Sequence, residues 1–249
     1  LSTTGKYSPV QDALGQLYSF YRDDYESDVE FCNFRSISVE GLKENLIYRG
    51  ASPVDNSRGR AAYTDSLLEL NGIRLVIDIA DIEEDYENYR GKDDFNSHYF
   101  ESLNNEGKVV FLGMGSSYEN KEYKESLVKG LREIVNSDGP VYIHCMEGKD
   151  RTGFMCMLLG ALSGGSYEDL MKDYMITYYN YYDVDYETTP EKYDAIVDLY
   201  FDTFTEYMTQ TDNVEDLKKA DFAEAAKQYL LSGGMSETEI EQLKEFICE

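Results

Sequence analysis

Short apolar runs recur along the first two thirds of the chain and predict buried strands. Each run is four to six residues long, and they lie at 46–49, 75–80, 108–112 and 140–144. The second run is apolar on both faces apart from Asp78, as expected of a central strand covered by helices on each side. The fourth follows a turn signal that ends in Gly-Pro.

Apolar residues at helical spacing separate these runs. Thr64 can cap a first helix and Gly72 is placed to end it. Its apolar face consists of Leu67, Leu68 and Leu70. A second apolar face spans 127–135, whereas residues 81–106 are acidic and poorly periodic, which predicts a loop or a short mobile helix. The alternation over 46–163 predicts an α/β fold, with a mostly parallel central sheet flanked by helices.

The rest of the chain reads as helical. Thr189-Pro190-Glu191 predicts the start of a long helix, and Ser236 with Glu239 forms a capping-box pattern for the last one. At 249 residues the chain suits a single domain over residues 1–249. We expect an α/β layer over about 30–163 and a helical extension over about 164–249.

The charge balance narrows the choice of partners. Lys and Arg number 23 against 49 Asp and Glu, a formal net charge of −26. Such a field argues against nucleic acid and against long-range attraction to anionic membranes. No stretch is long and apolar enough to be an integral membrane segment. The chain has neither a signal-peptide pattern nor an initiator Met, so both a cytoplasmic and a secreted location remain open. The sequence does not indicate an oligomeric state.

Four widely spaced cysteines form neither a zinc motif nor a disulfide framework, so no metal or other cofactor is expected. Cys156 lies in an apolar helix and suits a small buried residue. Cys32 and Cys248 are ordinary surface or core residues, or partners that could protect an oxidised Cys145 in a disulfide.

Cys145 carries the chemistry that the sequence suggests most strongly. It follows the fourth strand, a short polar loop leads to Arg151, and an apolar helix begins at about Thr152. Backbone N–H groups of such a loop converge at a helix N-terminus and bind an anion. The same donors stabilise a thiolate, so Cys145 is expected to be ionised and nucleophilic. The guanidinium of Arg151 offers a planar fork for two phosphoryl oxygens.

The segment from His144 to Gly153 resembles a known signature. His-Cys, five residues and Arg-Thr-Gly is similar to the loop of cysteine-dependent protein tyrosine phosphatases. Its longer form, His-Cys-Met-Glu-Gly-Lys-Asp-Arg-Thr-Gly, resembles a branch of bacterial tyrosine and dual-specificity phosphatases, some of which also act on phosphoinositides. Four further segments resemble landmarks of that branch: 33–35, 48–52, 72–78 and 217–243.

The resemblance implies a two-step hydrolysis through a cysteinyl-phosphate. Cys145 would attack phosphorus, while Arg151 and the loop, from Met146 through Glu147, Gly148 and Lys149 to Gly153, would bind the phosphate. An acid must then protonate the leaving oxygen. Tyrosine phosphatases usually supply it from a Trp-Pro-Asp loop, but the chain has no tryptophan. The first choice is therefore Asp150, with Asp78 and Asp81 as alternatives.

Several neighbouring residues allow two interpretations. Asp78 is an acid or the buried partner of a basic residue such as Arg49. Thr152 donates its hydroxyl to the sulfur or caps the helix, and His144 is expected to fix the loop by hydrogen bonding. The loop 52–60 covers the phosphate site with two free positive charges, Arg58 and Arg60, or is simply solvated. A cluster of tyrosines either packs ordinarily or forms an aromatic lid: Tyr178, Tyr179, Tyr181, Tyr182 and Tyr186.

Two loop residues favour different substrates. Lys149 suits a polyphosphorylated head group, whereas Glu147 opposes one, so phosphotyrosine or mixed specificity is favoured. The expected substrate is a phosphorylated protein or a small phosphorylated molecule. The alternatives are a phosphoinositide or inositol polyphosphate phosphatase, and a non-catalytic phosphate-binding module.

Overall fold

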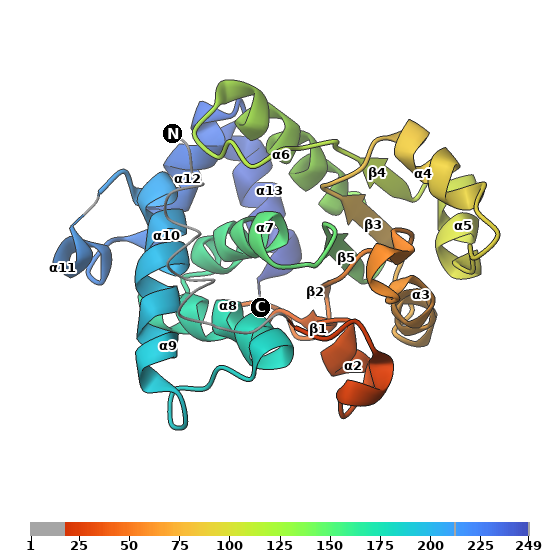
Figure 1. The fold of residues 1–249 in the computed structure, drawn as a ribbon. Helices are drawn as coiled ribbons and strands as arrows, with labels where there is room; N and C mark the ends of the chain where they lie inside the picture. The colour runs from red at the N-terminus through yellow and green to blue at the C-terminus, as the bar shows by residue number, and fades with distance from the viewer. Residues whose placement is uncertain (1–17, 212, 249) are drawn as a thin grey trace.

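A computed structural model describes residues 18–211 and 213–248. A five-stranded sheet with the order β1-β2-β5-β3-β4 forms its centre (Figure 1). Strands β2, β5, β3 and β4 are parallel, and β1 pairs antiparallel with β2. The strands are β1 (Arg35–Ser36), β2 (Ile47–Gly50), β3 (Leu75–Asp78), β4 (Val109–Phe111) and β5 (Val141–His144). The predicted mostly parallel α/β sheet is confirmed, and only the two-residue β1 lacked a sequence signal.

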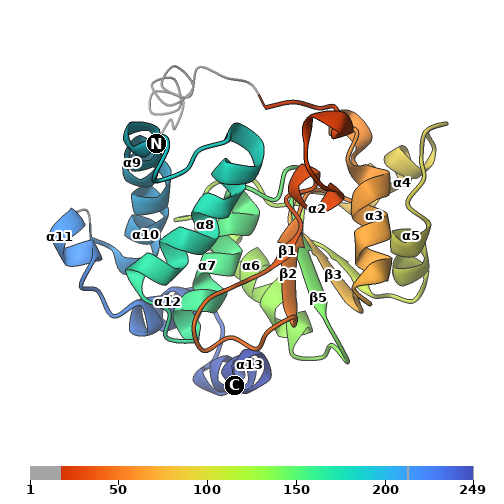
Figure 2. The same ribbon diagram turned by 90° about the horizontal axis from the view of Figure 1, so that it is seen from below.

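Helices cover both faces of the sheet because side chains alternate along the strands. Val76 and Tyr142 pack with one group of helices, and Ile77 and Ile143 pack with the other. Figure 2 shows α3, α4 and α5 on one side and α7, α8 and α12 on the other. The first side holds α2 (Asp28–Phe31), α3 (Ala61–Leu70), α4 (Glu83–Arg90) and α5 (His98–Asn105). The second holds α6 (Lys121–Ile134), α7 (Asp150–Leu162), α8 (Tyr167–Tyr182), α12 (Phe222–Ser232) and α13 (Glu237–Ile247).

The long helix predicted from Pro190 is present with one irregularity. It runs as α9 (Pro190–Ile196), a π-helical segment η3 (Val197–Phe201) and α10 (Asp202–Thr209). The short α11 (Val214–Leu217) follows. The last helix, α13, has the predicted capping box of Ser236 and Glu239. Two short 3₁₀ turns complete the elements, η1 (Arg22–Asp24) and η2 (Asn56–Arg58).

Three predictions about helices need correction. Helix α3 begins at Ala61, so Thr64 is buried inside it rather than capping it. Leu70 is 80% exposed and does not belong to the apolar face. Residues 81–106, predicted as a loop or a short mobile helix, contain two helices, α4 and α5. Helix α4 could not be predicted from the sequence, because Tyr86 is its only buried residue and no apolar repeat marks it.

Among the described residues, no helix combines the length and the apolar character needed to cross a membrane.

Candidate active site

The loop at 145–149 connects β5 to α7 at the carboxyl edge of the sheet. Strand β5 ends at His144 and α7 begins at Asp150, so Cys145 is the first residue beyond the strand. Cys145 is 4% exposed. A short loop between a central strand and a helix N-terminus can direct its N–H groups toward one anion, and the anion site predicted here stays a prediction.

Each carbonyl oxygen of this loop lies within hydrogen-bond distance of a group outside the loop. His144 Nδ1 lies 3.3 Å from the oxygen of Cys145, and the backbone N–H of Ser52 donates to that of Met146 at 3.0 Å. The Tyr181 hydroxyl donates to the Glu147 oxygen at 2.8 Å. Within the described part of the chain, no backbone N–H of residues 146–152 has a hydrogen-bond partner. These donors are therefore available to an anion beside Cys145.

Arg49 holds the end of the loop from a buried position. Its Nη2 donates to the carbonyl oxygens of Gly148 at 3.0 Å and Lys149 at 3.3 Å. Its Nη1 donates to the carboxylate of Asp173 on α8 at 2.9 Å. Both side chains are almost fully buried, so each charge depends on the other. The expected pairing of Arg49 with Asp78 is wrong, because Asp173 supplies the carboxylate from a distant part of the chain.

Asn33 donates a second hydrogen bond to the carbonyl oxygen of Gly148. Its side-chain amide donates to the oxygen of Gly148 at 3.3 Å and to Thr177 at 3.1 Å. The amide oxygen accepts from Arg35 at 2.6 Å and from Asn180 at 3.0 Å. Asn33 therefore ties β1 and α8 to the loop.

Gly148 can take its place only because it lacks a side chain. Its φ is +65°, a left-handed conformation that other residues rarely adopt. A Cβ atom there would lie 2.1 Å from the carbonyl oxygen of Gly50 in β2. The loop is thus packed directly against the neighbouring strand.

Arg151 and Thr152 occupy the first turn of α7. Arg151 Nη1 donates to the carbonyl oxygen of Met114, just after β4, at 2.8 Å. Thr152 is buried, and its hydroxyl has no hydrogen-bond partner among the described residues. The N-cap of α7 is Lys149, so the prediction that Thr152 caps the helix is wrong. A Cβ on Gly153 would lie 2.9 Å from the ring of Tyr174, which explains the small residue there.

Charged loop residues are paired with neighbours. Lys149 Nζ lies 3.6 Å from the carboxylate of Asp150. It also lies 5.9 and 5.8 Å from the ring centres of Tyr178 and Tyr182. Glu147 lies 3.5 Å from Arg58 of the loop 52–60, and burial raises its pKa.

Arg60 and two of the tyrosines are not placed as expected near the phosphate. Arg60 is not a free charge, because it is buried and its Nε donates to the carbonyl oxygen of Phe31 at 2.6 Å. Of the five tyrosines considered for a lid, Tyr179 and Tyr186 are the most exposed, at 52% and 65%. The other three pack against the loop or its lysine.

A buried group of titratable residues lies behind the loop. Asp78 accepts the N–H groups of Ala80 and Asp81 at 3.0 Å, and its other oxygen lies 3.6 Å from His144 Nε2. Burial raises the pKa of Asp78 to about 6. Burial and the charge of Asp78 raise the pKa of Asp81 to about 7. Burial lowers the pKa of His144 to about 4, so its imidazole is neutral at pH 7.

Asp81 shares an edge of the sheet with the cysteine loop. It follows β3, which pairs with β5, and its carbonyl accepts the N–H of Gly113 at 3.0 Å. Gly113 precedes Met114, whose carbonyl binds Arg151.

Burial raises the pKa of the other buried thiols, Cys32 and Cys156, to about 12, so neither is ionised at neutral pH.

The described residues contain no group of three or more His, Cys, Asp or Glu side chains that could bind a metal. Several supporting residues gave no sequence signal for their role: Met114, Asp173 and Tyr181. Each lies in a segment distant from the loop in sequence and contacts the loop, Arg151 or Arg49.

Comparison with known families matches residues 30–249 to the model of the tyrosine phosphatase family. Comparison with curated proteins gave no match. Two crystal structures of TpbA from P. aeruginosa align with the chain. The complex of a serine-for-cysteine variant with pTyr has a TM-score of 0.41 and 14% identity, covering 82% of this chain and 96% of that one. A second TpbA structure has a TM-score of 0.37 and 14% identity, covering 88% and 97%.

A methyl group at Gly148 should disrupt the loop. In Gly148→Ala the Cβ meets the backbone of Gly50, so we expect at least a tenfold loss of affinity for inorganic phosphate or vanadate, measured by calorimetry, and a lower Tm. Gly115→Ala is the matched control, since nothing lies within 4 Å of its added Cβ. Unchanged anion binding in Gly148→Ala would contradict this account of the loop.

The buried carboxyl of Asp81 should make stability fall as pH rises. Its folded-state pKa of about 7 exceeds the unfolded value, so the folded state binds more protons here between about pH 4 and pH 7. Stability from this group is present at low pH and lost as pH rises through 7. Asp81→Asn should raise the free energy of unfolding by about 2 kcal/mol at pH 8 and much less at pH 4.5, measured by urea titration. The control is Asp93→Asn, an exposed site with the same change in charge. Equal effects of both variants at pH 8 would refute the assignment.

Proposed function

The chain belongs to the tyrosine phosphatase family and is a protein tyrosine phosphatase, and we propose that it hydrolyses phosphotyrosine through a cysteinyl-phosphate on Cys145. One observation carries the assignment of the site. The carbonyls of residues 145–149 are bound from outside, which leaves the N–H groups of 146–152 for the phosphoryl oxygens. Such donors, fixed before the reaction, stabilise the charge that develops in the transition state.

In the first step the Cys145 sulfur forms a bond to phosphorus as the bond from phosphorus to the tyrosyl oxygen breaks. The guanidinium of Arg151, held at Met114, binds two equatorial oxygens through its fork. In the second step a water oxygen attacks phosphorus, the S–P bond breaks and the thiolate is restored. Thr152, whose buried hydroxyl is unpartnered in the described structure, donates to the sulfur as it leaves.

Asp150 is the proposed proton donor to the tyrosyl oxygen and the acceptor of the water proton. It lies next to Arg151 at the start of α7, and one of its oxygens is buried without a hydrogen-bond partner among the described residues. Asp81 is the alternative, because a carboxyl with a pKa of about 7 is about half protonated at pH 7 and can both donate and accept a proton. The two assignments differ in their expected pH dependence.

The surroundings of the loop favour phosphotyrosine over a polyphosphorylated head group. The ammonium of Lys149 is already paired with Asp150 and faces two tyrosine rings. Glu147 adds a carboxylate beside the loop. A lipid or inositol polyphosphate would need additional cations that this loop does not supply.

We also propose that the sheet and the C-terminal helices form one catalytic domain. A single apolar core contains strand residues such as Ile77 and Ile143 together with Leu230 of α12 and Leu243 of α13. Arg49 on β2 and Asp173 on α8 tie the two parts at the loop itself.

Replacing the nucleophile should abolish turnover. Cys145→Ser is expected to lower kcat for p-nitrophenyl phosphate by about 10⁴-fold or more while keeping vanadate binding. Cys248→Ser, a cysteine outside the loop, should retain full activity. If the unaltered protein is inactive under reducing conditions, or Cys145→Ser remains active, the proposed site is wrong.

Leaving-group dependence should identify the acid. Asp150→Asn is expected to lower kcat about 10²–10⁴-fold for a phosphotyrosine peptide and far less for p-nitrophenyl phosphate, whose phenolate leaves unaided. Stopped assays across pH 5–8 provide the comparison. If Asp81→Asn shows this pattern instead, and also removes a fall in rate near pH 7, the acid is Asp81 and the assignment to Asp150 fails.

A further inference from the structure

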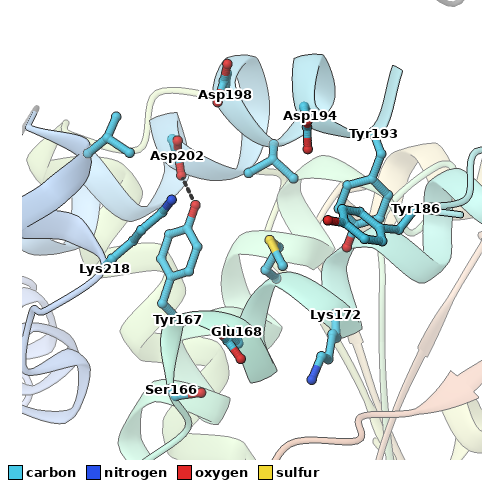
Figure 3. A pocket seen from close by; sticks show the side chains of 13 residues that line it. Ser166, Tyr167, Glu168, Lys172, Tyr186, Tyr193, Asp194, Asp198, Asp202 and Lys218 are labelled. Atoms are coloured by element: carbon cyan, nitrogen blue, oxygen red, sulfur yellow. Dashed lines mark hydrogen bonds between the residues drawn. The ribbon is translucent and has the colours of Figure 1, made fainter. Parts of the chain in front are cut away.

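A groove of about 1070 Å³ lies between α8, the helix α9–η3–α10 and α11 (Figure 3). Its size exceeds that of a typical site for a small molecule. The apolar floor comes from Met171, Val197 and Val214, and Val214 is 44% exposed. The π-helical segment, a distortion that is frequent at functional sites, forms part of one wall.

One wall of this groove is acidic. Asp194, Asp198 and Asp202 recur at every fourth position of the helix, and Glu168 of α8 also lines the groove. Figure 3 shows Asp194 and Asp202 pointing toward α8. Asp202 accepts a hydrogen bond from Tyr167 at 2.5 Å. Within residues 18–211 and 213–248, the exposed side chains of Asp194 and Asp198 have neither an ion pair nor a hydrogen bond.

Aromatic rings close one end of the groove. Tyr186 and Tyr193 meet edge to face, with ring centres 5.5 Å apart, next to Asp194. A tyrosine face beside a carboxylate suits a guanidinium or ammonium group with an aliphatic stem. Two lysines, Lys172 and Lys218, lie toward the α8 and α11 sides of the groove, but the four carboxylates outnumber them.

Helix α8 connects the groove to the cysteine loop, since its first residues line the groove and its last residue, Tyr182, lies beside Lys149. Tyr186 lies four residues after Tyr182, whose ring faces Lys149 of the loop. From Tyr182 back to Tyr167 the helix covers roughly 22 Å at 1.5 Å per residue. An extended peptide spans that length with roughly six or seven residues. A substrate with its phosphotyrosine at Cys145 can therefore reach the groove with a flanking segment.

We propose that this groove binds a basic, partly apolar segment that flanks the phosphotyrosine of the protein substrate. The inference rests on the proposed function of Cys145 and adds the charge of the substrate that the enzyme selects. Charge complementarity carries it: a dianionic phosphotyrosine is repelled by a protein of net charge −26, and Lys or Arg residues in its flank offset that repulsion. The apolar floor and tyrosine rings accept the stems and apolar side chains between them.

Steady-state kinetics on two matched peptides tests the proposal. One peptide carries Lys and Arg four to nine residues from the phosphotyrosine on both sides, and the other has Gln at those positions. The unaltered enzyme should show at least a tenfold higher kcat/KM on the basic peptide, mainly through KM. The double variant Asp194→Asn and Asp198→Asn should lose most of this preference, with kcat and activity on p-nitrophenyl phosphate unchanged.

The control isolates the groove from the field of the whole protein. Glu241→Gln with Glu245→Gln changes the net charge equally, from exposed positions on α13. It should preserve the preference, whereas an equal loss in both double variants would overturn the groove assignment. Equal kcat/KM values on the two peptides would overturn it as well. If the unaltered enzyme shows no activity on p-nitrophenyl phosphate, the proposed phosphatase site itself is refuted.

Discussion

The structure depends on a single constraint, the outward orientation of the carbonyl groups in the loop after β5. A backbone can direct successive N–H groups toward an anion only if its carbonyls are satisfied elsewhere. Here they are bound by a histidine ring, the backbone amide of Ser52, a tyrosine, an asparagine and an arginine. The left-handed Gly148 lets the loop pack on β2. The proposed anion site would thus be built before any anion arrives, which is what gives such donors their effect on a transition state.

A buried ion pair connects this loop to the helical half of the molecule. Arg49 reaches from the sheet to both the loop and Asp173, so the position of α8 and the shape of the loop are coupled. The tyrosines of α8 extend the coupling, since Tyr181 binds a loop carbonyl and Tyr182 faces Lys149. Helix α8 also forms a wall of the acidic groove, so one element contributes to both regions.

Local patterns predicted more of this protein than long-range partners did. Apolar runs located the four parallel strands, and the motif from His144 to Gly153 marked the loop, because strand, loop and helix are contiguous in sequence. The partner of Arg49 could not be found, since Asp173 lies more than a hundred residues away and any acidic residue was a candidate. Thr64 and Thr152 were misread as caps for a related reason. A threonine near a helix start suits a cap, but only tertiary packing decides where the helix begins. The acidic helix α4 was missed because it buries a single side chain.

The central claim is that Cys145 becomes covalently phosphorylated during turnover. Rapid acid quenching of the enzyme during hydrolysis of a phosphotyrosine peptide, followed by mass spectrometry of a proteolytic digest at low pH, measures this directly. The account predicts the added mass of one phosphoryl group on the peptide that contains Cys145, absent when substrate is omitted. Turnover without this adduct, or an adduct on another cysteine or on a histidine, would contradict it.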